Sequence, residues 1–104
     1  MKVYTKVATT VKDKEMVRVR FRLVIGKREE YFHKSEIFVN VKYWDSNKEC
    51  YKTNNSSPFT DQESKQVADR IIERKKIIQN VYLSLDNKEL LTSKKFDQLV
   101  NDSF

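Results

Sequence analysis

The chain has 104 residues, of which 38% are hydrophobic and 35% are charged, and its formal net charge is +6. One cysteine excludes an intrachain disulfide, and one cysteine with one histidine offers neither a redundant zinc ligand set nor a Cys-His or Ser-His catalytic pair. No apolar run approaches the roughly 18–20 residues of a membrane span and no signal-peptide pattern opens the chain, so we expect one domain in the cytoplasm.

The basic excess is confined to one part of the chain. Residues 1–34 contain ten Lys/Arg and four Asp/Glu, whereas residues 35–104 contain eleven of each. The whole net charge of +6 therefore lies in the first third of the sequence. Segregated positive charge is typical of nucleic-acid-binding proteins, although a basic surface that merely keeps the chain solvated is the simpler alternative.

Two stretches near the N-terminus have the pattern of strands. Residues 2–8 mix β-branched and aromatic residues and predict a short first strand. After a polar connection at residues 10–15, residues 16–25 alternate strictly, which is the period of extended chain. One side of this second strand is apolar and the other carries three arginines, whose mutual repulsion suggests an anionic partner: Arg18, Arg20 and Arg22.

Gly26 and Lys27 predict a two-residue hairpin turn, followed by a return strand over residues 28–33. That turn would pair Arg22 with Tyr31, so that Tyr31 and His33 join the arginine face and Phe32 joins the apolar face. A longer turn would change these partners, because a shift of one residue moves every side chain to the other face. Residues 35–39 can form one more short extended piece.

The middle of the chain is turn-rich. We expect Trp44 to anchor the core beneath the sheet. Residues 46–58 have no hydrophobic periodicity and predict a loop, in which Cys50 is an incidental thiol.

Residues 60–63 match a capping box, in which Thr60 and Glu63 satisfy free backbone N–H groups at the start of a helix that runs to about Leu85. Arg74 falls inside the apolar stripe of this helix and should either extend past the sheet edge or pair with an acid. Ile72 lies off the stripe. The apolar stripe itself consists of Val67, Ile71, Ile77, Ile78, Val81, Tyr82 and Leu85.

These elements predict an α+β fold with a small three-stranded antiparallel sheet packed on one long C-terminal helix. The helix covers the apolar face of the sheet and leaves the arginine face open. A second helix starts at Thr92, and its exposed Phe96, Leu99 and Val100 suggest that the chain is the N-terminal piece of a longer protein.

The residues that catalysis would need are missing from the pattern. A single glycine rules out a Gly-rich phosphate loop, and the carboxylates are scattered among lysines. No nucleophile stands beside a base. We therefore expect no enzymatic activity, no metal and no cofactor.

Binding to double-stranded DNA is the function that the pattern favours. The major groove is about 12 Å wide and admits a β-ribbon, and arginine can bind either phosphates or guanine there. Lysines are expected to contact phosphates, which position the protein without specifying sequence. The predicted DNA-binding residues are Arg18, Arg20, Arg22, Lys27, Arg28, Tyr31, Lys6 and Lys14.

A basic strand, a Gly-Lys turn and an aromatic return strand are followed by the segment Ile-Phe-Val-Asn-Val-Lys-Tyr-Trp-Asp at residues 37–45. This order resembles the N-terminal arm-type DNA-binding domain of Bacteroides-type tyrosine recombinases, the integrases of phages and conjugative transposons. Trp44-Asp45 is the best single match, and Glu36 stands where many relatives have glycine. The resemblance covers about residues 1–85. It implies a three-stranded sheet laid in the major groove of arm sites, and a catalytic domain elsewhere in the parent protein.

In the same terms, residues 1–85 would be the arm-type domain, and residues 86–104 a linker or the start of a helical core-binding domain. Two other functions remain open. RNA could stack on Tyr31 and His33. Alternatively, Ile72 and the terminal apolar face could dock a protein partner.

Overall fold

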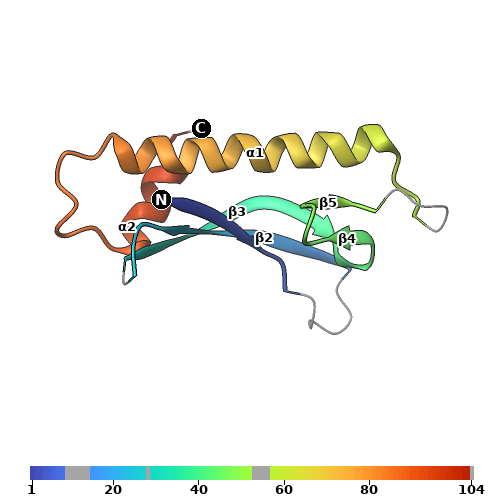
Figure 1. The fold of residues 1–104 in the computed structure, drawn as a ribbon, viewed down its shortest axis with the longest axis horizontal. Coiled ribbons are helices and arrows are strands. Elements are labelled where there is room, and N and C mark those ends of the chain that lie inside the picture. The colour runs from blue at the N-terminus through green and yellow to red at the C-terminus, as the bar shows by residue number, and fades with distance from the viewer. Residues whose placement is uncertain (9–14, 28, 53–56, 104) are drawn as a thin grey trace.

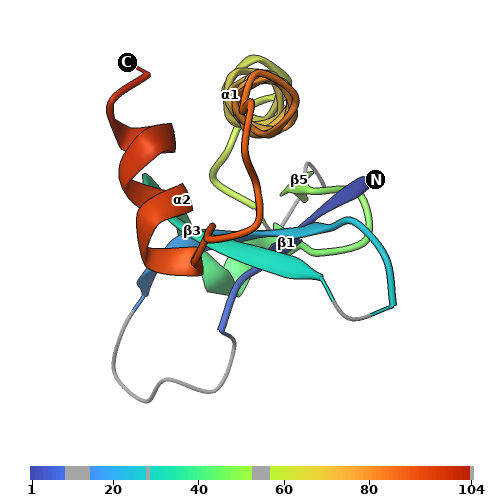
Figure 2. The same cartoon turned by 90° about the vertical axis from the view of Figure 1, so that its left-hand side faces the viewer.

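The computed structural model describes residues 1–8, 15–27, 29–52 and 57–103, in which a sheet lies beneath two helices (Figure 1). The sheet is antiparallel and has the order β1-β2-β3. Both helices lie on the same side of this sheet (Figure 2). The predicted α+β fold, a three-stranded antiparallel sheet on a long helix, is confirmed. The elements are β1 (Lys2–Lys6), β2 (Met16–Val24), β3 (Glu30–Asn40), α1 (Asp61–Leu83) and α2 (Ser93–Asn101).

Period-two alternation divides the strands into a covered and an uncovered face. Every second residue of β3, from Tyr31 to Val39, is buried, and the residues between them are exposed. β2 follows the same rule around Phe21, which is 1% exposed. The buried side chains pack against α1 and α2 to form one core.

Helix α1 begins where the capping box predicts. The Thr60 hydroxyl accepts a hydrogen bond from the backbone N–H of Glu63 at 3.2 Å, which satisfies one of the free donors of the first turn. Ile71, Ile78 and Tyr82 are buried in the predicted stripe, and Arg74 is buried with them. The helix ends at Leu83, two residues before the predicted end.

Helix α2 begins next to the predicted start at Thr92, which is its N-cap, since the Thr92 hydroxyl accepts a hydrogen bond from the backbone N–H of Lys95. The expected exposure of its apolar face is wrong: Phe96 and Val100 are fully buried, because this amphipathic helix packs on β3. The ring of Phe96 lies 5.3 Å from that of Tyr31. α2 is thus part of the same core, and its assignment to a following domain stays a prediction.

The predicted hairpin register is wrong by one residue. β2 and β3 pair Arg22 with Phe32 and Leu23 with Tyr31, and the connection closes through a hydrogen bond from the Ile25 N–H to the Glu29 carbonyl. A two-residue turn with glycine in its first central position requires a positive φ there, which Gly26 does not have. The longer connection puts Phe32 on the arginine face and Tyr31 in the core.

Residues 30–40 form one long strand, not a return strand with a separate extended piece. A bulge interrupts its pairing with β2, where residues 35–37 lie opposite Val19. The buried Ser35 hydroxyl bridges the bulge, because it donates to the Val19 carbonyl at 2.6 Å and accepts from the Ile37 N–H at 3.1 Å.

After β3, a 3-10 turn at Val41–Tyr43 leads into a small ribbon of β4 (Trp44–Asp45) and β5 (Cys50–Tyr51). β5 corrects the expectation that residues 46–58 form a loop throughout. Trp44 is a core anchor as predicted: it is 6% exposed, and its ring meets that of Tyr51 edge-on at 5.5 Å.

Candidate nucleic-acid interface on the open face of the sheet

The face of the sheet that lies away from both helices (Figure 2) carries most of the exposed positive charge of the strands, and we call it the open face. Its side chains come from alternate positions of all three strands. Six of them are cations and three are aromatic. The open face consists of Lys2, Tyr4, Lys6, Arg18, Arg20, Arg22, Glu30, Phe32, Lys34 and Phe38.

Strand pairing arranges these side chains in cross-strand rows. Side chains of directly opposed residues stand about 5 Å apart at Cβ, so each row is a line of contacts across the sheet. One row is mixed, one is entirely cationic, and one pairs a cation with a ring. These three rows are Tyr4–Arg22–Phe32, Lys6–Arg20–Lys34 and Arg18–Phe38, and in a fourth row Val24 stands between Lys2 and Glu30.

The cationic row is electrostatically unfavourable. Arg20 stands opposite Lys6 on one side and Lys34 on the other. Two like unit charges about 5 Å apart repel by about 1 kcal/mol in water, and like charges on directly opposed residues destabilise a sheet. Among the described residues, no acidic side chain forms an ion pair with any of the three. A bound polyanion would remove this repulsion.

The other two arginines are held in place by neighbours. Nε and Nη2 of Arg22 both lie 2.7 Å from Oε2 of Glu30. The guanidinium of Arg18 lies over the Phe38 ring, 5.2 Å from its centroid, in a cation–π arrangement. These contacts orient the two guanidinium groups while leaving them on the surface.

The predicted site residues fall into three groups. Arg18, Arg20 and Arg22 share the open face, as predicted, and Lys6 of β1 lies on it beside them. Lys27 is exposed in the β2–β3 connection. Lys14 and Arg28 lie outside the described residues. Contact with DNA remains a prediction for all of them.

Tyr31 is the exception, because its placement on the arginine face is wrong. It is 7% exposed and points toward the helices. Its hydroxyl donates to Oε1 of Glu29 at 2.9 Å, and the Tyr82 hydroxyl of α1 donates to the same oxygen at 2.8 Å. Burial and the Glu29 carboxylate raise the pKa of Tyr31, and they raise the pKa of Tyr82 to about 12. Tyr31 therefore joins the sheet to α1.

The expectation that His33 joins the arginine face is also wrong, since it is 1% exposed beneath the helices. Its Nδ1 lies 2.7 Å from Oδ1 of Asp97 on α2, and its Nε2 lies 3.0 Å from Nη1 of Arg74 on α1. Burial lowers the pKa of His33, although Asp97 opposes that shift. RNA stacking on Tyr31 and His33 is thereby excluded as a mechanism.

Arg74 lies within the apolar stripe of α1, and its charge is compensated there by an acid. Its guanidinium binds the carboxylate of Glu36 on β3 through two nitrogens. This hydrogen bonding lowers the pKa of Glu36 to about 2. Because the bulge in β3 lets Glu36 reach α1, this acid does not neutralise the open face.

The open-face residues absent from the predicted DNA-binding set include Tyr4, Phe32, Lys34 and Phe38. The alternation of residues 30–40 carries the missing signal. Odd positions hold Tyr, His, Ser, Ile and Val, and even positions hold Glu, Phe, Lys, Glu, Phe and Asn. Treated as one strand, the segment assigns both phenylalanines to the polar face, whereas the assumed two-residue turn reverses Phe32.

Two shallow hollows lie on the open face beside the phenylalanine rings. One has a volume of about 330 Å³ and is lined by Tyr4, Phe32, Arg20 and Arg22 among others. The second, of about 440 Å³, is lined by Phe38, Arg18 and Arg20 among others. Arg20 and Lys6 border both, so the hollows are neighbours on one surface.

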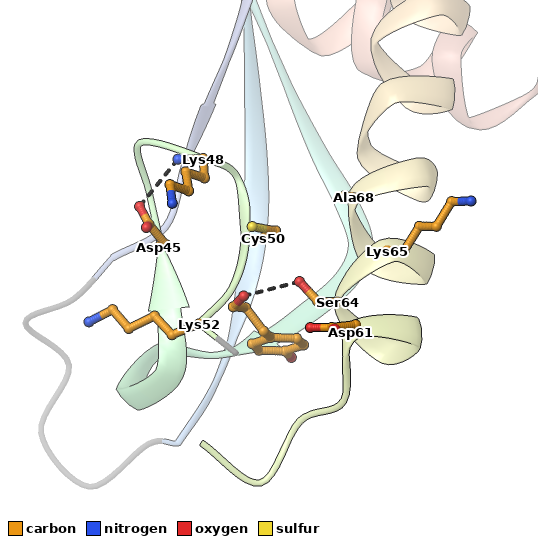
Figure 3. Close-up of a pocket in the computed structure, with 9 residues that line it drawn as sticks. Asp45, Lys48, Cys50, Lys52, Asp61, Ser64, Lys65 and Ala68 are labelled. Atoms are coloured by element: carbon orange, nitrogen blue, oxygen red, sulfur yellow. Dashed lines mark hydrogen bonds between the residues drawn. The ribbon is translucent and has the colours of Figure 1, made fainter. Parts of the chain in front are cut away.

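A larger hollow of about 770 Å³ lies elsewhere, between the β4–β5 ribbon and the first turns of α1 (Figure 3). Its lining mixes Lys48, Lys52 and Lys65 with Asp45 and Asp61. The Ser64 hydroxyl is already donated to the Tyr51 carbonyl, and the Asp45 carboxylate accepts from the Lys48 N–H. A lining with charges of both signs singles out no ligand.

The chain gives no significant match to protein-family models, to curated proteins or to solved structures. In the part of the chain that the structure describes, no three His, Cys, Asp or Glu side chains gather as a metal site. Neither α1 nor α2 combines the length and the apolar character that a bilayer-spanning helix requires. The open face is therefore the candidate functional site.

Proposed function

We propose that this protein binds double-stranded DNA through the open face of its sheet. The observation that supports the proposal best is the cationic row Lys6–Arg20–Lys34, which stands at the centre of a face that neither helix covers. Phosphates at the rim of a groove would neutralise it. A three-stranded sheet can enter the major groove, where arginine side chains reach guanine and lysine side chains reach the backbone.

The resemblance of the sequence to arm-type domains of tyrosine recombinases supports the same proposal. On that basis the DNA would be an arm site, and the chain would be the N-terminal module of a site-specific recombinase in the cytoplasm. Its role is to bind and position, and strand cleavage belongs to another domain. The alternative function, docking of a protein partner on the apolar face of the second helix, is less well supported, because Phe96 and Val100 of that face are buried in the core.

The proposal is tested by titrating duplex DNA at several salt concentrations. Five open-face cations have no acidic partner among the residues that the structure describes. If each of them releases a counterion, the slope of log affinity against log salt should be about −4 to −5. Arg20→Ala should weaken binding about tenfold and make the slope shallower by about 0.9. The matched control is Lys76→Ala, which removes one exposed cation from α1 on the other side of the sheet and should change affinity by less than about twofold.

Affinity that neither falls with salt nor distinguishes Arg20→Ala from Lys76→Ala would contradict the proposal. A preference for single strands of the same sequence would also contradict it, because the open face would then act as a stacking surface.

A further inference from the structure

We infer that Phe32 and Phe38 contact the 5-methyl groups of two thymines in the bound DNA. This inference rests on the proposed function and goes beyond it, because it assigns a chemical specificity to the open face. It starts from the exposure of the two rings, 48% for Phe32 and 44% for Phe38. Scattered exposed apolar residues are ordinary, but these two rings stand on the same face, beside the arginines.

Each ring is paired with one guanidinium. Phe32 lies directly opposite Arg22, and Phe38 lies directly opposite Arg18. In the major groove, thymine presents its methyl group, which phenylalanine contacts, and guanine presents N7 and O6, which arginine binds in a bidentate manner. A ring and a guanidinium held side by side therefore match a thymine next to a guanine.

The spacing of the two pairs gives the spacing of the thymines. Arg18 and Arg22 are four residues apart on β2, which corresponds to about 13 Å of strand. DNA rises about 3.4 Å per base pair. If β2 follows the groove, the two contacted thymines lie about four base pairs apart, with Arg20 and its flanking lysines between them.

The surroundings of Phe38 favour contact with a methyl group over stacking with an unpaired base. The Arg18 guanidinium already lies over one side of the Phe38 ring. The hollow beside each ring is bordered by arginine and lysine, so a group that enters it meets both the ring and cations. The edge of a base pair, with its methyl group and its acceptors, supplies both kinds of contact at once.

The experiment removes only the methyl groups. A duplex pool with a randomised centre is enriched on the protein and then amplified in parallel with dTTP or with dUTP, which changes thymine to uracil and leaves base pairing intact. The wild-type protein should bind the thymine pool about fourfold more tightly for each contacted methyl, hence about fifteenfold for two. This ratio is measured on one protein sample, so an unfolded fraction cancels.

Phe32→Ala and Phe38→Ala should each reduce the ratio to about fourfold, and the double variant should bring it near one. The matched control is Ile72→Ala, which truncates an apolar side chain on α1 that is 51% exposed, and it should keep the wild-type ratio. Equal affinity for the two pools, enriched or not, overturns the inference. If duplex binding is then still salt-dependent and sensitive to Arg20→Ala, the proposed function stands without it.

A third possible result would contradict both the thymine contacts and the binding of double-stranded DNA. Tighter binding to single strands, with no difference between thymine and uracil, would overturn both the inference and the proposed function. It would assign the rings to base stacking.

Discussion

The two faces of the sheet are built from alternate residues of the same strands, and they differ in how their polar groups are satisfied. On the covered face, His33 is held by Asp97 and Arg74, and the Ser35 hydroxyl is held by the Val19 carbonyl. Among the described residues, no buried side-chain polar atom is without a hydrogen-bond partner. On the open face, the row around Arg20 brings three cations together without an acid.

This difference separates the residues that stabilise the fold from those to which we assign the proposed binding. A buried polar group that lacks a partner is costly, so the covered face is complete within the chain. An exposed cation is solvated and tolerates repulsion at a modest cost. The open face is the surface to which we assign the proposed partner, so substitutions on the two faces should separate folding from binding.

The largest expected contrast is between two phenylalanines of the same sheet. Phe21→Ala, at a position 1% exposed, should lower the free energy of unfolding by about 3–5 kcal/mol. Phe32→Ala, at a position 48% exposed on the open face, should lower it by less than about 1 kcal/mol. Urea denaturation followed by circular dichroism measures both. Equal losses would mean that Phe32 is packed as part of the core.

A smaller contrast is expected between two glutamates of β3. Glu36→Gln weakens the charged partner of the buried Arg74 guanidinium and should cost about 1–3 kcal/mol of unfolding free energy. Glu30→Gln removes an exposed pair with Arg22 and should cost at most about 0.5 kcal/mol. In the proposed complex Glu30 would compete with DNA for Arg22, so Glu30→Gln should also tighten DNA binding.

Glu36 should also make the stability of the protein depend on pH in the acid range, in a direction that its pKa determines. Hydrogen bonding to Arg74 lowers the pKa of Glu36 from 4.5 to about 2 in the folded protein. Its stabilising contribution is therefore present above about pH 4.5 and is lost as the pH falls toward 2. Glu36→Gln should flatten the stability profile in that range. Parallel profiles for wild type and Glu36→Gln would contradict the role given to Arg74.

Much of the fold follows from the sequence because single patterns determine single elements. The alternation of residues 16–25 fixes β2, and the capping residues Thr60 and Thr92 fix the starts of both helices. The register of β3 does not follow in this way. It depends on the backbone conformation at Gly26 and on the packing of Tyr31 against Tyr82, which are tertiary properties.

The candidate site, like the fold, has one part that the sequence predicts and one part that depends on tertiary structure. The three arginines of β2 are predictable, because one strand's own alternation places them. The aromatic half of the site, Phe32 and Phe38, depends on the register and on a strand that continues through a bulge. Arg74 shows a further limit, since its acid partner lies 38 residues away on another element.

The subtlest expected difference between the faces concerns pH near neutrality. Burial lowers the pKa of His33 below 6.5, with Asp97 opposing the shift and Arg74 adding to it. Below about pH 6.5 the unfolded chain binds a proton at this position that the folded protein binds less readily. Stability should therefore be greatest above pH 6.5 and should decline as the pH falls through the lower pKa of the folded state.

DNA binding should not follow this decline while the protein remains folded, because the only histidine lies on the covered face and lysine and arginine stay protonated. Urea midpoints between pH 8 and 5.5 should fall for the wild type and stay level for His33→Gln, while the salt slope of DNA binding stays constant. The single histidine signal in NMR spectra reports the titration directly. A histidine that titrates at or above pH 6.5, with level stability, would contradict the buried neutral state that joins β3 to both helices.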